Sequence, residues 1–212
     1  MQPRYTDTGV FIAFEGGEGG GKSTQAQLLA DRLTAQGRQV LLTREPGATA
    51  VGQQLRAIVL GHETGELAAR TEALLYAADK AEHVESIVLP ALAAGQVVIT
   101  DRYVDSALAY QGAGRTLDVA EVEQVNRWAT ADLRPHLTVV LDVDPAVGLG
   151  RFDGADRIEA EPLEFHQRVR DGFLALAARD PEHYIVVSGT EPPETVHAAV
   201  CAAVDAWLEQ AR

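Results

Sequence analysis

The sequence is poor in cysteine, in aromatic residues and in positive charge. Cys201 is the only cysteine, and aromatic residues make up 6% of the 212 residues. A lone cysteine cannot form an internal disulfide, so the chain fits a reducing compartment, and we expect a cytoplasmic protein. Against 31 acidic residues stand only 18 lysines and arginines, which gives a formal net charge of −13. This balance argues against nucleic acid and against an anionic membrane surface as partners.

Long hydrophobic runs are missing as well. No stretch reaches transmembrane length, and the N-terminal MQPRYTDTG is polar, without the apolar core of a signal peptide. We expect residues 1–8 to form a short flexible extension. The remaining composition is that of a globular protein, 46% hydrophobic and 23% charged, and the length suits a single α/β domain over residues 1–212.

The most specific motif in the chain is Gly16–Ser23, which reads GGEGGGKS and matches the phosphate-binding pattern G-x-x-x-x-G-K-[ST]. The apolar run Val10–Phe14 precedes it, and helical spacing that puts Leu28, Leu29 and Leu33 on one face follows it. This strand–loop–helix setting is the one that the motif requires, and it disfavours a glycine-rich turn without a ligand. The glycines let successive N–H groups point into one cavity at the positive end of a helix.

The loop predicts a site for the phosphates of ATP. Lys22 would reach the β- and γ-phosphates, and the Ser23 hydroxyl would ligate Mg²⁺. In so acidic a chain, a site for phosphates must concentrate its few cations locally. The predicted ATP-binding residues are Gly16, Gly17, Glu18, Gly19, Gly20, Gly21, Lys22, Ser23 and Thr24.

Apolar runs typical of β-strands alternate with stretches of helical spacing. Strands are predicted over 10–14, 39–43, 96–100, 137–143 and 184–187, and helices over 23–32, 51–60, 66–94, 104–110, 119–131 and 193–210. The alternation predicts an α/β fold, a five-stranded and mainly parallel sheet with helices on both faces. Ligands bind such sheets at the carboxyl ends of the strands.

Charged residues cluster after these strand ends. Arg44 follows the second strand, and Asp101 and Arg102 follow the third. A guanidinium fork binds phosphate oxygens in pairs, so Arg44 and Arg102 are candidates to clamp an acceptor phosphate. Asp101, beside the loop, would orient Mg²⁺ or a water bound to it. The alternative is a surface ion pair of little energetic value; the neighbouring phosphate loop favours the functional interpretation.

A third charged and glycine-rich cluster, RFDGADR, lies at residues 151–157. The segment over about 150–158 is predicted to be a mobile lid. An arginine from it would close over the transferring group. A solvated loop without a special role is the equal alternative from the sequence alone.

Taken together, these motifs and several further blocks resemble bacterial thymidylate kinase over nearly the whole length of the chain. The blocks that carry the resemblance are FEGGEGGGKST (14–24), TREPGA (43–48), GQQLRAIVL (52–60), RTEALLYAADKAEHV (70–84), DRYVDSALAYQGAGR (101–115), PHLTVVLDV (135–143) and DRIEAEPLEFHQRV (156–169). The family makes dTDP from dTMP and ATP with Mg²⁺, folds around a five-stranded parallel sheet and works as a homodimer. The resemblance therefore implies these properties for the present chain.

The resemblance also implies roles for single residues. Arg102 would bind the dTMP phosphate, Asp101 would serve the magnesium–phosphate network, and Glu18 would approach the sugar 3′-hydroxyl or the acceptor site. Tyr110 would pack on the deoxyribose, and Tyr76 stands where the family usually stacks a phenylalanine on thymine. The implied dTMP-binding residues are Arg44, Arg56, Tyr76, Lys80, Arg102, Ser106, Tyr110 and Gln111.

The chain departs from the family pattern at several positions, and these bear on base recognition and on the source of the catalytic arginine. Gly19 replaces an arginine that one subtype uses in catalysis, so the arginine should come from the lid, with Arg151 and Arg157 as candidates. Lys80 replaces a common arginine near the base, and Ala107 replaces a common serine or asparagine. Two rival functions remain open: a kinase for a different monophosphate, and a P-loop switch or regulatory ATPase. The lack of an N-K-x-D motif weakens a GTPase interpretation.

Two further interpretations concern residues outside these motifs. Trp128 and Trp207 are interpreted as packing residues on apolar helix faces. The six histidines lack the spacing of metal ligands, so no zinc site is predicted.

Overall fold

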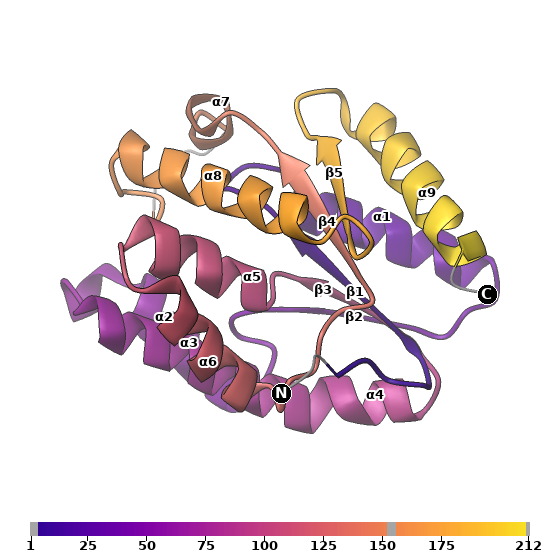
Figure 1. The fold of residues 1–212 in the computed structure, drawn as a ribbon, viewed down its shortest axis with the longest axis horizontal. Coiled ribbons are helices and arrows are strands. Elements are labelled where there is room, and N and C mark those ends of the chain that lie inside the picture. Colours follow the sequence, from indigo (N-terminus) through magenta and orange to yellow (C-terminus); the bar gives the residue numbers. More distant parts are fainter. Residues whose placement is uncertain (1–3, 152–155, 211–212) are drawn as a thin grey trace.

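The structure is a computed structural model that describes residues 4–151 and 156–210. Its centre is a five-stranded sheet in the order β2-β3-β1-β4-β5, and every pair of neighbouring strands is parallel (Figure 1). The strands are β1 Val10–Glu15, β2 Val40–Arg44, β3 Val97–Asp101, β4 Leu137–Asp142 and β5 Tyr184–Ser188. This confirms the predicted α/β fold with a five-stranded sheet. Short, continuously apolar strands favour such a fold, because helices can cover them on both faces.

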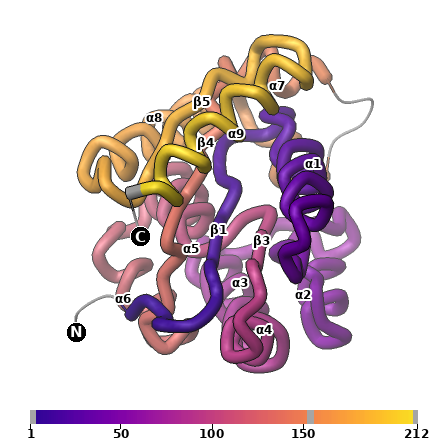
Figure 2. Tube along the Cα trace, turned by 90° about the vertical axis from the view of Figure 1, so that its right-hand side faces the viewer, coloured from indigo at the N-terminus to yellow at the C-terminus, as the bar shows by residue number. Residues whose placement is uncertain are grey.

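Helices pack on both faces of this sheet. Their bounds are α1 Lys22–Ala35, α2 Ala50–Leu60, η1 His62–Thr64, α3 Ala69–His83, η2 Val84–Val88, α4 Leu89–Ala93, α5 Val104–Ala107, η3 Leu108–Gly114, α6 Val119–Ala129, α7 Pro145–Leu149, α8 Leu163–Arg179 and α9 Pro193–Gln210. One core cluster joins the sheet to α1 and α9, which lie together in Figure 2. Two further clusters join the other face to α4, α5, α6, η3 and α8.

Two predicted helices contain a change of winding. The single helix expected over 66–94 is α3, a π-helical stretch η2 and α4 in succession. The helix expected over 104–110 is α5, which continues as the π-helical η3 to Gly114. Apolar spacing does not distinguish these windings over a few residues, and π-helical turns often occur at functional sites. Both π-helical stretches adjoin helices whose side chains line the site described below.

The expected N-terminal extension is docked where the structure describes it. Arg4 pairs with Leu133 in a parallel bridge, and the Tyr5 ring stacks on His183 with centroids 4.8 Å apart. Residues 1–3 lie outside the described part. The predicted lid, about 150–158, is described only in part, because 152–155 also lie outside it. Within the described residues, no helix combines the length and apolarity needed to cross a membrane.

The two tryptophans differ in how far they are buried. Trp207 packs partly buried against the cluster of α1 and α9, as predicted. Trp128, on α6, has 86% of its surface exposed, so its interpretation as a packing residue within the chain is wrong. Apolar spacing along a helix cannot show whether the covering surface belongs to the same chain or to another.

Candidate active site

A cavity of about 460 Å³ opens at the carboxyl ends of the central strands. It is lined by most of the predicted site residues: Glu18, Gly19, Gly20, Gly21, Lys22, Ser23, Thr24, Arg44, Arg56, Tyr76, Lys80, Asp101, Arg102, Ser106, Tyr110, Gln111 and Arg151. Its lining does not include Gly16, Gly17 or Arg157. Residues that the sequence did not single out also line it, namely Glu45, Pro46, Leu60, Asp156, Ile158 and Glu159.

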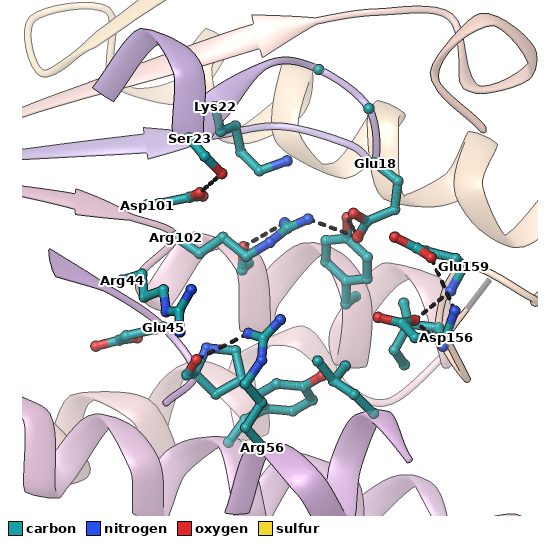
Figure 3. Close-up of a pocket in the computed structure, with 18 of the residues that line it drawn as sticks. Glu18, Lys22, Ser23, Arg44, Glu45, Arg56, Asp101, Arg102, Asp156 and Glu159 are labelled. Atoms are coloured by element: carbon teal, nitrogen blue, oxygen red, sulfur yellow. Dashed lines mark hydrogen bonds and ion pairs between the residues drawn. The ribbon is translucent and has the colours of Figure 1, made fainter. Parts of the chain in front are cut away.

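The cavity gathers positive charge from an acidic chain. Among the residues that the structure describes, six lysines and arginines line it, against five acidic residues, although acidic residues outnumber basic ones by 31 to 18 in the sequence. The close-up in Figure 3 shows Lys22 on one side, Arg44 and Arg56 on the other, and Arg102 between them. A site for two phosphorylated ligands requires such a local concentration of cations. The positive potential in a cleft of this kind attracts anions.

The phosphate loop is held by close backbone contacts. Gly19 has a φ of +66°, and a Cβ there would lie 2.1 Å from the carbonyl oxygen of Gly148 on α7. A side chain at this position would collide with the neighbouring backbone, which explains the glycine found there. Gly21, with a φ of +84°, precedes α1 directly, so the loop amides and the helix N-terminus face the same cavity.

Lys22 is buried in this loop. Its Nζ donates a hydrogen bond of 2.7 Å to the carbonyl oxygen of Gly17. Burial lowers the pKa of Lys22 to about 8, and the nearby Arg102 guanidinium adds to the decrease, which Glu18 partly opposes. The ammonium therefore sits in a position where incoming phosphate oxygens would stabilise its charged form.

Ser23 and Asp101 form an oxygen pair at the edge of the loop. The Ser23 hydroxyl donates a hydrogen bond to the Asp101 carboxylate, although the two residues come from α1 and β3. Hydroxyl and carboxylate oxygens suit Mg²⁺, which keeps several waters and takes substrate oxygens as further ligands. Among the described residues there is no group of three or more candidate protein ligands, so this pair fits a cation held mainly by phosphate and water.

Arg102 is oriented by contacts on three sides. Its Nη2 lies 2.7 Å from Glu18 Oε1, and its Nη1 donates 3.1 Å hydrogen bonds to Gly16 O and to Ser106 Oγ. The guanidinium also lies over the Tyr110 ring, 4.9 Å from the centroid. Such a fixed fork is suited to a phosphate, because its donors need no reorganisation when the anion arrives.

Glu18 is a strong acid in this setting. Burial would raise the pKa of Glu18, but Arg102, Lys22 and the Tyr110 hydroxyl together lower it to about 2. The Tyr110 hydroxyl donates a 2.7 Å hydrogen bond to the same carboxylate oxygen that Arg102 contacts. Glu18 is therefore ionised at physiological pH and neutralises part of the charge of Arg102 in the free pocket.

A buried polar chain that the sequence did not predict supports Lys80. The Lys80 ammonium lies 3.4 Å from Glu45 Oε2, and Glu45 Oε1 lies 2.7 Å from His83 Nδ1. The other ring nitrogen of His83 lies 2.7 Å from the Thr43 hydroxyl. Lys80 also stands 5.7 Å from the centroid of the Tyr76 ring. Lys80 therefore presents a positive charge beside the Tyr76 ring in the cavity lining.

The two lid arginines have different environments. Arg151 lines the cavity, and its guanidinium donates to Gly19 O at 2.6 Å and to Gly189 O at 3.1 Å. Arg157 instead pairs with the fully buried Glu72 and donates to the carbonyl oxygen of Val59 at 2.9 Å. Of the two predicted candidates, the structure brings only Arg151 to the phosphate loop.

Comparison with known proteins gives one consistent result. Residues 14–200 match the family model described as thymidylate kinase. A thymidylate kinase from Clavibacter sepedonicus is 54% identical, with 91% of this chain and 93% of that protein covered. One from Cutibacterium acnes is 52% identical, covering 91% and 94%. The crystal structure of a thymidylate kinase from Ehrlichia chaffeensis superposes with a TM-score of 0.79 at 32% identity, covering 93% of this chain and 99% of that one.

Proposed function

Because the chain belongs to the thymidylate kinase family, which transfers the γ-phosphoryl group of ATP to dTMP to give dTDP and ADP, we propose how its pocket divides that reaction among its residues. The observation that carries the proposal is the shared cavity of Lys22 and Arg102. The loop amides and Lys22 bind the phosphates of ATP, and Arg102 binds the phosphate of dTMP. The two anions then meet inside one cationic pocket.

The chemical step is an in-line displacement. An oxygen of the dTMP phosphate forms a bond to the γ-phosphorus while the bond to the β–γ bridging oxygen breaks, and ADP leaves with that electron pair. No covalent enzyme intermediate is formed. Lys22, Arg102 and a lid arginine stabilise the charge on the transferring group. Ser23 and Asp101 would hold Mg²⁺, which would neutralise charge on the phosphate oxygens.

The acceptor end of the pocket recognises the nucleoside by shape and by hydrogen bonding. Tyr76 offers its ring to the thymine, Lys80 offers a donor to a base carbonyl, and Tyr110 packs against the deoxyribose. Gln111 also lines this end of the pocket, and a 3.0 Å hydrogen bond that its amide donates to Glu72 orients it. Arg44 and Arg56 add positive charge near the acceptor phosphate.

The direct test compares phosphate acceptors and one arginine variant. With ATP as donor, ADP release should be fastest with dTMP and slower with dUMP, dCMP and dGMP. Arg102→Ala should reduce turnover by about a hundredfold or more, as the loss of a preorganised charged contact does. Arg38→Ala is the matched control, because Arg38 is exposed and precedes the start of β2, whereas the pocket lies at the carboxyl ends of the strands. Hydrolysis of ATP that ignores dTMP, or normal turnover of Arg102→Ala, would contradict the proposal.

We propose Arg151 as the lid arginine that acts in catalysis. Its place in the cavity lining supports this choice, while Arg157 is engaged by Glu72. Arg151→Ala should lower kcat by about a hundredfold and leave the melting temperature unchanged. Arg157→Ala should chiefly lower the melting temperature, because Glu72 loses one of its two arginine partners. Single-turnover rates and thermal denaturation of both variants separate these roles, and the reverse pattern would assign the role to Arg157.

We also propose that the chain forms a homodimer through α2, α3 and α6. These helices pack side by side (Figure 1). They carry exposed large apolar side chains, which are Val51, Ile58, Leu74, Val119 and Trp128. An apolar surface of this kind marks an interaction site, and a second copy of the chain would cover it. The cytoplasmic location stays a prediction from the cysteine content.

A further inference from the structure

A fully buried acid that the reaction does not use is Glu15, the last residue of β1. Its carboxylate accepts three hydrogen bonds from the segment after β3. Oε1 accepts from the backbone N–H of Tyr103 at 2.8 Å and of Ser106 at 3.1 Å, and Oε2 accepts from the Ser106 hydroxyl at 2.6 Å. A carboxylate with so many donors fixes the groups around it, because leaving any of them unpaired in the interior is costly.

The segment that Glu15 holds includes Arg102. The backbone of Arg102 has a φ of +71°, a left-handed conformation that residues other than glycine adopt only at a cost. Its carbonyl oxygen accepts a hydrogen bond of 2.9 Å from the Thr100 hydroxyl, and its amide donates to Phe14 at the same distance. Glu15 holds the next amide in the chain, so it completes the set of contacts that keep this turn in place.

Glu15 also acts on the Arg102 side chain through Ser106. The Ser106 hydroxyl donates a hydrogen bond to Glu15 and accepts a 3.1 Å hydrogen bond from Arg102 Nη1. Because the Ser106 hydroxyl proton points at the Glu15 carboxylate, a lone pair of the hydroxyl oxygen faces the Arg102 guanidinium. Without the hydrogen bond to Glu15, the hydroxyl proton could rotate toward Arg102 and repel its positive charge.

We infer that Glu15 is a positioning residue for the acceptor phosphate, which sets both the backbone turn and the guanidinium direction of Arg102 without touching either substrate. This inference rests on the proposed role of Arg102. It predicts that changes at Glu15 affect dTMP more than ATP, because Arg102 is the proposed contact of the dTMP phosphate, whereas Lys22 and the loop amides are the proposed contacts of ATP.

Glu15→Gln tests the inference with almost no change of shape. The amide oxygen can still accept from the two N–H groups, but the amide nitrogen now donates toward Ser106, and the serine proton must turn elsewhere. We expect the KM for dTMP to rise about tenfold, the effect of weakening one hydrogen bond to a charged group, with the KM for ATP changed less than about twofold. Asp105→Asn is the matched control: it is another buried acid in the same segment, but it binds the Tyr184 hydroxyl at 2.7 Å.

A second pair of variants keeps the test decisive if Glu15→Gln fails to fold. Ser106→Ala removes the bridge, whereas Ser106→Thr keeps a hydroxyl, so the alanine variant should show the raised KM for dTMP and the threonine variant should recover most of it. Circular dichroism and thermal denaturation check the fold of each protein. Equal increases in the KM of both substrates, or an unchanged KM for dTMP in a folded Glu15→Gln or Ser106→Ala protein, would overturn the inference.

Arg102→Ala, measured alongside, distinguishes the proposed role of Arg102 from the positioning role of Glu15. If Arg102→Ala loses activity while a folded Glu15→Gln behaves as the unmodified protein, only the positioning role fails. If Arg102→Ala itself retains normal use of dTMP, the proposed function of the arginine fails, and the inference about Glu15 fails with it.

Discussion

At the scale of single residues, the pocket depends on charges that burial has altered. Lys22 is the clearest case, because its ammonium is enclosed and shares the space with another cation. Burial, together with Arg102, lowers the pKa of Lys22 to about 8. Bound phosphates would restore the charged form, so the titration of Lys22 should be visible in the free enzyme and suppressed in the ATP complex.

The pKa of Lys22 therefore predicts how kcat/KM for ATP changes with pH. As the pH rises through about 8, Lys22 loses its proton in the free enzyme, and kcat/KM for ATP should fall, approaching about tenfold per pH unit. The value of kcat should hold to higher pH, since it reports the complex. A pH profile of both parameters measures this. In Lys22→Arg, whose guanidinium does not titrate, the alkaline fall should disappear even though activity is lower. A flat kcat/KM for the unmodified protein up to about pH 10 would contradict the prediction.

A second residue-scale prediction concerns the buried pair of Lys80 and Glu45, whose side chains are 3% and 2% exposed. Lys80→Met should lower the free energy of unfolding by about 3 kcal/mol, because it leaves a buried carboxylate without its ammonium partner. Adding Glu45→Gln should recover much of the loss. Urea denaturation measures both changes.

The control for this pair is Arg70→Met. Arg70 lies 3.8 Å from Glu121 on the surface, with both side chains mostly exposed, so breaking this pair should have no measurable effect on stability. If Lys80→Met proves no more destabilising than Arg70→Met, the Lys80–Glu45 pair is not the support that the geometry indicates.

The sequence predicted residues whose signal is local and missed those whose partners are distant. Lys22 and Ser23 follow from a continuous motif with the correct flanks. Glu15 looks like an ordinary strand residue, and its partners lie 88 and 91 residues further along the chain. His83 is similar, since its contact with Glu45 spans 38 positions. Only the packing of β1 against β3 and of α3 near β2 makes these groups recognisable as supports of the site.

At the scale of elements, the shape of the phosphate loop depends on its neighbour α7. The two backbones touch: a Cβ at Gly148 would lie 2.2 Å from the carbonyl oxygen of Glu18. The short helix is itself fixed, because Asp144 caps its first turn and Arg170 of α8 binds Asp142 just before it. The motif places the loop between a strand and a helix, where the structure has β1 and α1, but nothing in the local pattern of 145–149 indicated that α7 contacts this loop. The same contact is what brings Arg151 beside the loop.

Gly148→Ala therefore tests an element-scale contact. The added methyl group must push α7 and the loop apart, and a displacement of roughly 1 Å at a catalytic loop can cost about a hundredfold in kcat/KM. We expect the KM for ATP to rise while the stability falls by only about 1–3 kcal/mol, the usual cost of overpacking. Steady-state kinetics with varied ATP measures the effect. Gly150→Ala is the control, since the nearest atom to a Cβ there is 3.3 Å away. Equal ATP kinetics in the two variants would rule out the brace.

At the scale of the whole molecule, the fold followed from the alternation of apolar strands and helices, while the use of the outer surface did not. The pattern that buries Trp207 against α1 and α9 is hardly different from the one that carries Trp128, yet Trp128 is 86% exposed. Spacing along one helix records which side chains prefer cover. It does not record whether a second chain supplies that cover, and for Trp128 the described residues of this chain do not.

The exposed face of α2, α3 and α6 should therefore control assembly. Leu74 and Trp128 project from adjacent helices, and replacing both with glutamate puts charge into the proposed contact between two copies. Because both side chains are exposed in the single chain, its fold should survive, while sedimentation velocity should show monomers in place of dimers. Val186→Glu is the control, a half-exposed valine on the edge strand β5, and should remain dimeric. Since α2 and α3 carry Arg56 and Lys80, loss of the dimer should also raise the KM for dTMP; unchanged sedimentation of the double variant would place the interface elsewhere.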